Sequence, residues 1–107
     1  MLVNEGILKE LKTYVTEQTL EKAEELHKNE KVLIKKINYE NNNNYTINAE
    51  VEGRLDKYQT KIEVKNSELN NVNCTCPDYE STYGTCKHIL ATAYEVNSSE
   101  KYKRIFN

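Results

Sequence analysis

The chain has 107 residues, of which 30% are charged and 37% are hydrophobic, and its formal net charge is −2. This length predicts a single domain over residues 1–107 with one modest core. The sequence has no apolar run near the roughly 18 residues of a membrane span, and residues 1–10 lack the apolar segment of a secretory signal. We therefore expect a cytoplasmic protein that does not contact a membrane.

The N-terminal part, residues 1–28, is expected to be helical. Its apolar residues recur at helical spacing, with charged residues between them, and they are Leu8, Leu11, Val15, Ala23 and Leu26. Thr16 interrupts this stripe, and a threonine hydroxyl can cap a new helix. The pattern is compatible with one long helix or with two shorter ones.

The pattern changes to strands from Lys31 onward. Lys31–Tyr39 is rich in β-formers, and residues 45–51 and 58–64 alternate between apolar and polar side chains. Asn41–Asn44 and Gly53 separate these segments and supply the residues that tight turns prefer. The alternation predicts hairpins with one buried face.

The remaining elements complete an α+β fold. Asn66–Asn71 is expected to form a polar turn, and Val72 to open a short fourth strand. Residues 31–73 would thus form a small antiparallel meander of three to four strands. A zinc-binding loop and an amphipathic helix are expected over residues 74–97, followed by a tail at residues 98–107.

All three cysteines fall within thirteen positions, as Cys74, Cys76 and Cys86, and His88 follows in the form C-x-C-x9-C-x-H. Three thiolates and one imidazole make a closed tetrahedral set of the kind that a structural zinc ion takes. No position is left for a water molecule, which argues against catalysis at the metal. We expect the chain to turn at Thr75, between the first two ligands.

Two other interpretations of the cluster stay open. The cysteines could be buried free thiols beside an incidental histidine, or they could form a redox site, although redox sites favour C-x-x-C at the start of a helix. Lys87 is placed to compensate the negative charge of a zinc-thiolate site, or is an ordinary solvated lysine.

The C-x-C pair, the variable loop and the C-K-H followed by an apolar helix resemble the SWIM zinc finger. This domain occurs in Swi/Snf-type ATPases, certain transposases and signalling proteins. Three upstream segments are similar to the region that precedes the finger in Swi/Snf-family helicases, and the resemblance covers about residues 17–96. These segments are Ala23–Leu26, Lys31–Leu33 and Ala49–Gly53, the last followed by Tyr58 and Ile62.

The resemblance implies that Cys74, Cys76, Cys86 and His88 bind one zinc ion and that the module contacts DNA or another protein. These residues contain no glycine-rich Walker A loop, so the ATPase of a Swi/Snf parent would lie elsewhere. The partner could then be the ATPase domains of the same parent chain, and the location would be nucleoid-associated.

Several basic and aromatic residues are candidates for contacts with nucleic acid or a partner. Each also has a structural explanation, as part of a solvated face, a cover for the zinc site or a terminal tail. The candidates are Lys57, Lys61, Lys65, Tyr79, Tyr83, Lys87, Lys101, Lys103 and Arg104.

Three classes of function remain. A nucleic-acid contact module would bind with strong salt dependence, whereas a protein-docking module would tolerate salt. The net charge of −2 favours docking to protein. An enzyme has little support, because no acid/base pair or activated nucleophile is evident, and no small-molecule substrate is expected. We expect a zinc-stabilised accessory module of a Swi/Snf-type ATPase, or alternatively a stand-alone nucleic-acid-binding zinc finger protein.

Overall fold

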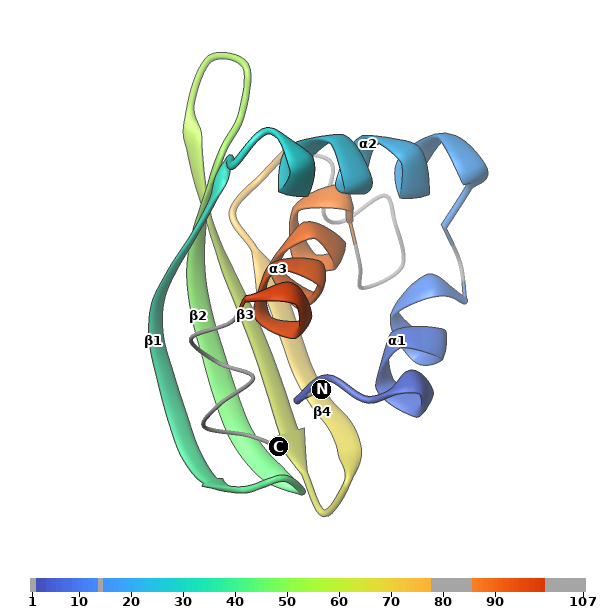
Figure 1. The fold of residues 1–107 in the computed structure, drawn as a ribbon, viewed down its shortest axis with the longest axis vertical. Helices are drawn as coiled ribbons and strands as arrows, with labels where there is room; N and C mark the ends of the chain where they lie inside the picture. Colours follow the sequence, from blue (N-terminus) through green and yellow to red (C-terminus); the bar gives the residue numbers. More distant parts are fainter. Residues whose placement is uncertain (1, 14, 78–85, 100–107) are drawn as a thin grey trace.

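The computed structural model describes residues 2–13, 15–77 and 86–99. Within these residues, three helices and four strands follow one another (Figure 1). They are α1 (Glu5–Lys12), α2 (Glu17–Lys28), β1 (Val32–Asn41), β2 (Asn44–Glu52), β3 (Lys57–Lys65), β4 (Glu68–Cys74) and α3 (Lys87–Ser98). The predicted α+β class is confirmed, and residues 100–107 of the predicted tail lie outside the described residues.

The N-terminal part consists of two helices rather than one. The Asn4 side chain accepts a hydrogen bond from the Ile7 amide at 3.0 Å and caps α1. Thr16 caps α2, because its hydroxyl accepts from the Thr19 amide at 3.2 Å. Each cap satisfies an amide that a helix leaves unpaired in its first turn, so the interruption at Thr16 marks the start of the second helix.

The strands form one antiparallel sheet in the order β1-β2-β3-β4, which confirms the meander. One boundary differs from the expectation: β4 begins at Glu68 instead of Val72. Asn66 and Ser67 both have positive φ, at 53° and 66°, as a two-residue turn between twisted strands requires. Lys65 therefore already pairs with Glu68, and the expected turn over Asn66–Asn71 is too long.

The turn between β2 and β3 depends on a glycine. The Gly53 amide donates to the Asp56 carbonyl at 2.7 Å. A Cβ atom at residue 53 would approach the Tyr58 ring to 2.5 Å, so a larger residue would displace this ring. Leu55, near the tip of the hairpin, is 93% exposed.

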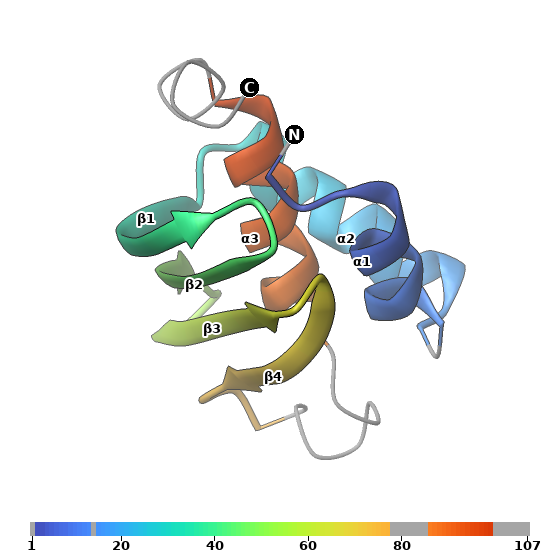
Figure 2. The same ribbon diagram turned by 90° about the horizontal axis from the view of Figure 1, so that it is seen from below.

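α3 lies between two layers (Figures 1 and 2). The sheet covers one side of this helix, and α1 and α2 cover the other. The position explains why α3 is buried nearly all round, including Ile89, Leu90 and Ala93, whereas a surface helix buries a single stripe. The inward residues of the sheet meet α3 in the core, among them Ile47 and Ile62.

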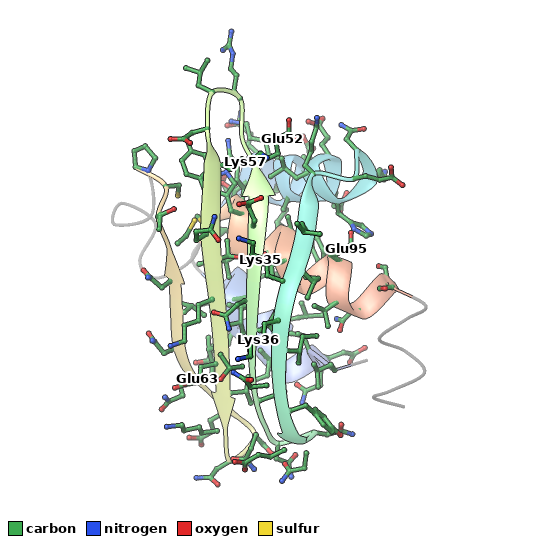
Figure 3. All side chains as sticks on the ribbon, turned by 90° about the vertical axis from the view of Figure 1, so that its left-hand side faces the viewer. Lys35, Lys36, Glu52, Lys57, Glu63 and Glu95 are labelled. Carbon is green, nitrogen blue, oxygen red and sulfur yellow. The ribbon has the colours of Figure 1, made fainter. Side chains whose placement is uncertain are left out.

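The far face of the sheet is open and polar (Figure 3). β3 buries Thr60, Ile62 and Val64, and because side chains alternate along a strand, its charged residues point to the opposite face. They are Lys57, Lys61, Glu63 and Lys65. Within the described part of the chain, no helix is long and apolar enough to span a bilayer.

Candidate metal centre

Cys74 is the last residue of β4, and Cys76 follows it by two positions. The Thr75 amide donates to the Gln59 carbonyl at 3.1 Å, and the Gln59 amide donates to the Thr75 hydroxyl at 2.9 Å. Thr75 therefore still contacts β3, and the chain bends one residue later than expected, at Cys76. Both cysteines are buried and Thr75 between them is exposed, as is usual for residues two apart at the end of a strand.

Cys86 and His88 come from the start of α3. Cys86 is the N-cap residue, with extended backbone, and His88 lies in the first turn. Both are buried, at 2% and 3% exposure. The end of β4 and the start of α3 thus meet, although residues 78–85 between them lie outside the described part.

The four side chains bring their ligand atoms together. All four atoms lie within 4.8 Å of one another, and His88 Nδ1 is 3.7 Å from Cys74 Sγ and 3.8 Å from Cys86 Sγ. Ligands on a tetrahedral zinc ion, with Zn–S about 2.3 Å and Zn–N about 2.0–2.1 Å, stand roughly 3.5–3.8 Å apart. The three thiols and the imidazole therefore fit one zinc ion.

The burial of the thiols also favours a bound cation. A hydrogen bond with Cys74 and burial raise the pKa of the Cys86 thiol to about 12, although His88 and the Ile89 amide act in the opposite direction. Buried thiolates without compensation are unfavourable, whereas a zinc ion binds the deprotonated thiolate and stabilises its charge. Metal binding would therefore release protons from these thiols.

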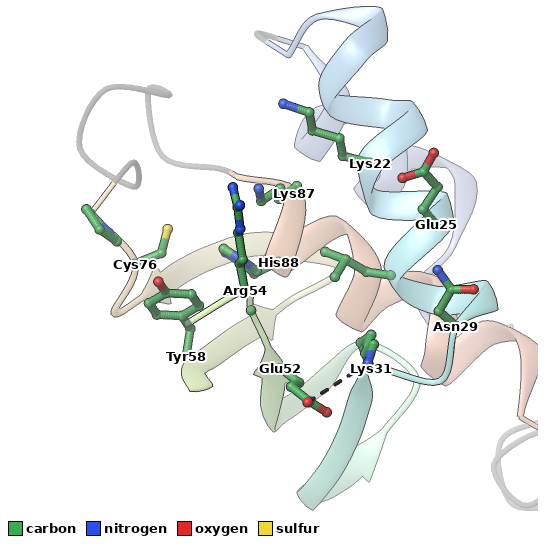
Figure 4. Close-up of a pocket in the computed structure, with 13 residues that line it drawn as sticks. Lys22, Glu25, Asn29, Lys31, Glu52, Arg54, Tyr58, Cys76, Lys87 and His88 are labelled. Atoms are coloured by element: carbon green, nitrogen blue, oxygen red, sulfur yellow. Dashed lines mark ion pairs between the residues drawn. The ribbon is translucent and has the colours of Figure 1, made fainter. Parts of the chain in front are cut away.

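A cavity of about 590 Å³ lies beside the centre. Its walls come from α2, the β2–β3 hairpin and the start of α3, and Cys76, His88 and Tyr58 line it (Figure 4). The Tyr58 and His88 rings are tilted, with their centroids 4.8 Å apart. We call this cavity the metal-side cleft. Its charged lining residues are Lys22, Glu25, Lys31, Glu52, Arg54 and Lys87.

The predicted contact residues that the structure describes do not form one site. Lys87 lines the metal-side cleft, whereas Lys57, Lys61 and Lys65 lie along the open face of β3. Lys65 is 3.9 Å from Glu63, so its charge is partly compensated. Five further candidates lie outside the described residues, namely Tyr79, Tyr83, Lys101, Lys103 and Arg104.

Sequence reasoning did not single out Lys22 or Arg54, which join Lys87 around the cleft. Lys22 looks like any exposed helix lysine in the sequence. Arg54 had one weak indication, because it follows the turn glycine Gly53 and precedes the exposed Leu55.

Four clustered thiol and imidazole ligands beside an antiparallel meander define a zinc-binding α+β domain. The SWIM zinc finger family model matches residues 58–97, which include β3, β4, all four ligands and nearly all of α3. Residues 58–97 are thus similar to the SWIM zinc finger, and the match does not extend to residues 17–57. Comparison with the curated proteins and with the solved structures gives no significant match.

Proposed function

We propose that this chain is a SWIM-type interaction module in which one zinc ion has a structural role. The observation that carries the proposal is the cluster of four buried ligand atoms, all within 4.8 Å of one another. A structural zinc ion takes four protein ligands, whereas a catalytic zinc ion keeps a position for water or substrate. The ligand set supports a role in holding β4 against α3, and we propose that the domain is not itself an enzyme.

The proposal extends to the context of the domain. We infer an accessory role beside a Swi/Snf-type DNA-dependent ATPase, with contacts to DNA or to another protein, including the ATPase domains of the same parent. The support is the similarity of Ala23–Leu26, Lys31–Leu33 and Ala49–Gly53 to the region that precedes the finger in such proteins. A cytoplasmic location, associated with the nucleoid, follows from this context.

The first test is the metal content of the purified domain. We expect elemental mass spectrometry to find one zinc ion per chain. Substitution of the four ligands should abolish zinc binding. Cys76→Ala should lower the zinc content, whereas Thr75→Ala, which changes the exposed residue between two ligands, should retain it. A zinc-free chain with an unchanged melting temperature would refute the structural-zinc proposal.

The second test separates the two kinds of partner. The zinc-loaded domain is titrated into labelled single-stranded and duplex DNA at about 50 and 200 mM salt, a range over which several phosphate contacts cost orders of magnitude in affinity. Salt-sensitive binding supports DNA contact. If no binding is seen at low salt, the protein-contact form of the proposal is favoured.

A further inference from the structure

The metal-side cleft gathers positive charge from three separate elements. Lys22 comes from α2, Arg54 from the β2–β3 hairpin and Lys87 from the first position of α3. Figure 4 shows the three cationic groups on the same side of the cleft. Residues so distant in sequence meet only through the tertiary fold, so the cleft is a formed feature of this structure.

These charges are largely uncompensated. Lys31 and Glu52 also line the cleft, but they pair with each other at 3.9 Å. Lys22, Arg54 and Lys87 form no ion pair with any residue of the described ranges 2–13, 15–77 and 86–99. With Glu25 as the remaining carboxylate, the four cations and two carboxylates of the lining sum to +2. A zinc ion held by three thiolates adds −1, so the zinc-loaded cleft keeps a net charge of +1. This charge favours an anionic ligand, although the whole chain is acidic.

The open sheet face is a weaker anion site than the cleft. Lys65 is 3.9 Å from Glu63, and Lys35 is 3.6 Å from Glu50. The positive charge there is interrupted by carboxylates, and exposed lysines on a sheet are normal for a solvated surface. The cleft differs because its cations surround a concave site.

We propose that the metal-side cleft binds the phosphate backbone of nucleic acid, an assignment that rests on the interaction role proposed above and specifies its partner and surface. Lys22, Arg54 and Lys87 contact phosphate groups, and the half-buried Tyr58 ring faces a sugar or base. An aromatic ring among cations is typical of sites for single strands. The cavity of about 590 Å³ accommodates one nucleotide unit at a time.

The experiment measures binding of a fluorescein-labelled twelve-nucleotide oligothymidine by anisotropy, with the zinc-loaded full chain. Lys22→Gln, Arg54→Gln and Lys87→Gln should each weaken binding about 3–10-fold, and each should reduce the dependence of log affinity on log salt by about 0.7, the loss expected for one phosphate contact with a single strand. A parallel titration with a twelve-base-pair duplex shows whether single-stranded or duplex DNA supplies the phosphates.

Two matched controls remove the same charge outside the cleft. Lys28→Gln changes an exposed lysine on the same helix as Lys22, and Lys36→Gln changes an exposed lysine on β1. Both should weaken binding less than 2-fold. Equal losses in the control and cleft variants would overturn the assignment, because binding would then depend on diffuse charge. Zinc content and melting temperature should be unchanged in all five variants.

Two further results would also overturn the inference. Absence of oligonucleotide binding at about 50 mM salt by the folded, zinc-loaded chain would exclude a phosphate site and leave the module's protein-contact role intact. Polyglutamate binding that is as tight as oligonucleotide binding, and equally sensitive to the three cleft variants, would assign the cleft to an acidic protein. A wild-type chain that binds no zinc would instead count against the proposed function.

Discussion

The two ends of α3 are held in place by different chemistry. At its start, Cys86 and His88 join Cys74 and Cys76 in a cluster suited to a metal ion. At its far end, the Asn97 side chain accepts from the Val3 amide at 3.0 Å and donates to the Val3 carbonyl at 2.8 Å. The first arrangement needs zinc to compensate its thiolates, whereas the second is complete without a ligand. We expect the two ends to respond differently to metal removal.

The largest effect should follow loss of the metal. A chelator, or His88→Ala, removes binding energy that exists only in the folded state, so we expect the melting temperature to fall by more than about 10 °C. Hydrogen exchange should quicken first at Cys74 and at the start of α3, and later in β1 and β2. His27→Ala is the matched control, since it removes a histidine outside the cluster. An unchanged melting temperature in both tests would contradict a structural zinc site.

The metal end was also the easier part to predict from the sequence. The spacing of Cys74, Cys76, Cys86 and His88 specifies a ligand set without knowledge of the fold, and β-strand alternation predicts the buried faces. The start of β4 was missed because Asn70 and Asn71 resemble turn residues, although their strand has a polar, solvated side. The metal-side cleft was not predictable, since Lys22, Arg54 and Lys87 lie more than 30 positions apart and meet only when α2, the hairpin and α3 pack.

The next largest effect is expected at the opposite end of α3. Asn97→Ala removes two hydrogen bonds and leaves the Val3 amide and carbonyl without these partners, which should cost about 1–3 kcal/mol of unfolding free energy. Urea unfolding of the zinc-loaded protein measures this loss. Ser98→Ala, at an exposed neighbouring position, should have little effect. Zinc affinity should stay unchanged in both variants, and a parallel loss of zinc affinity would show that the two ends are coupled.

Tyr45 provides a pH-dependent test at the Asn97 end of the core. Its buried hydroxyl donates to the Leu2 carbonyl at 3.2 Å, and burial raises the pKa of Tyr45 to about 12 from 10.0. The folded state therefore holds this proton more tightly than the unfolded state does. This contribution to stability is complete below pH 10 and is lost as the pH rises through 12.

Tyr45→Phe should cost about 1 kcal/mol at neutral pH through the lost hydrogen bond. Between pH 10 and pH 12 the wild-type protein should lose up to about 2–3 kcal/mol relative to the variant. Urea unfolding of both zinc-loaded proteins from pH 8 to pH 12 measures the difference, and groups that titrate in both proteins cancel. Parallel stability curves would show that Tyr45 does not titrate differently on folding.

The smallest effect is expected for the pair that joins α2 to α3. His27 Nδ1 is 3.1 Å from Glu95 Oε1, and each side chain is 26% exposed. Partly exposed pairs contribute little, so a double-mutant cycle with His27→Gln and Glu95→Gln should give a coupling energy below about 1 kcal/mol, decreasing with salt. A coupling above about 2 kcal/mol would contradict this. His27 and His88 are the two histidines of the chain, and we expect their surroundings to decide their importance: one has a partly solvated carboxylate as its partner, and the other has three buried thiols.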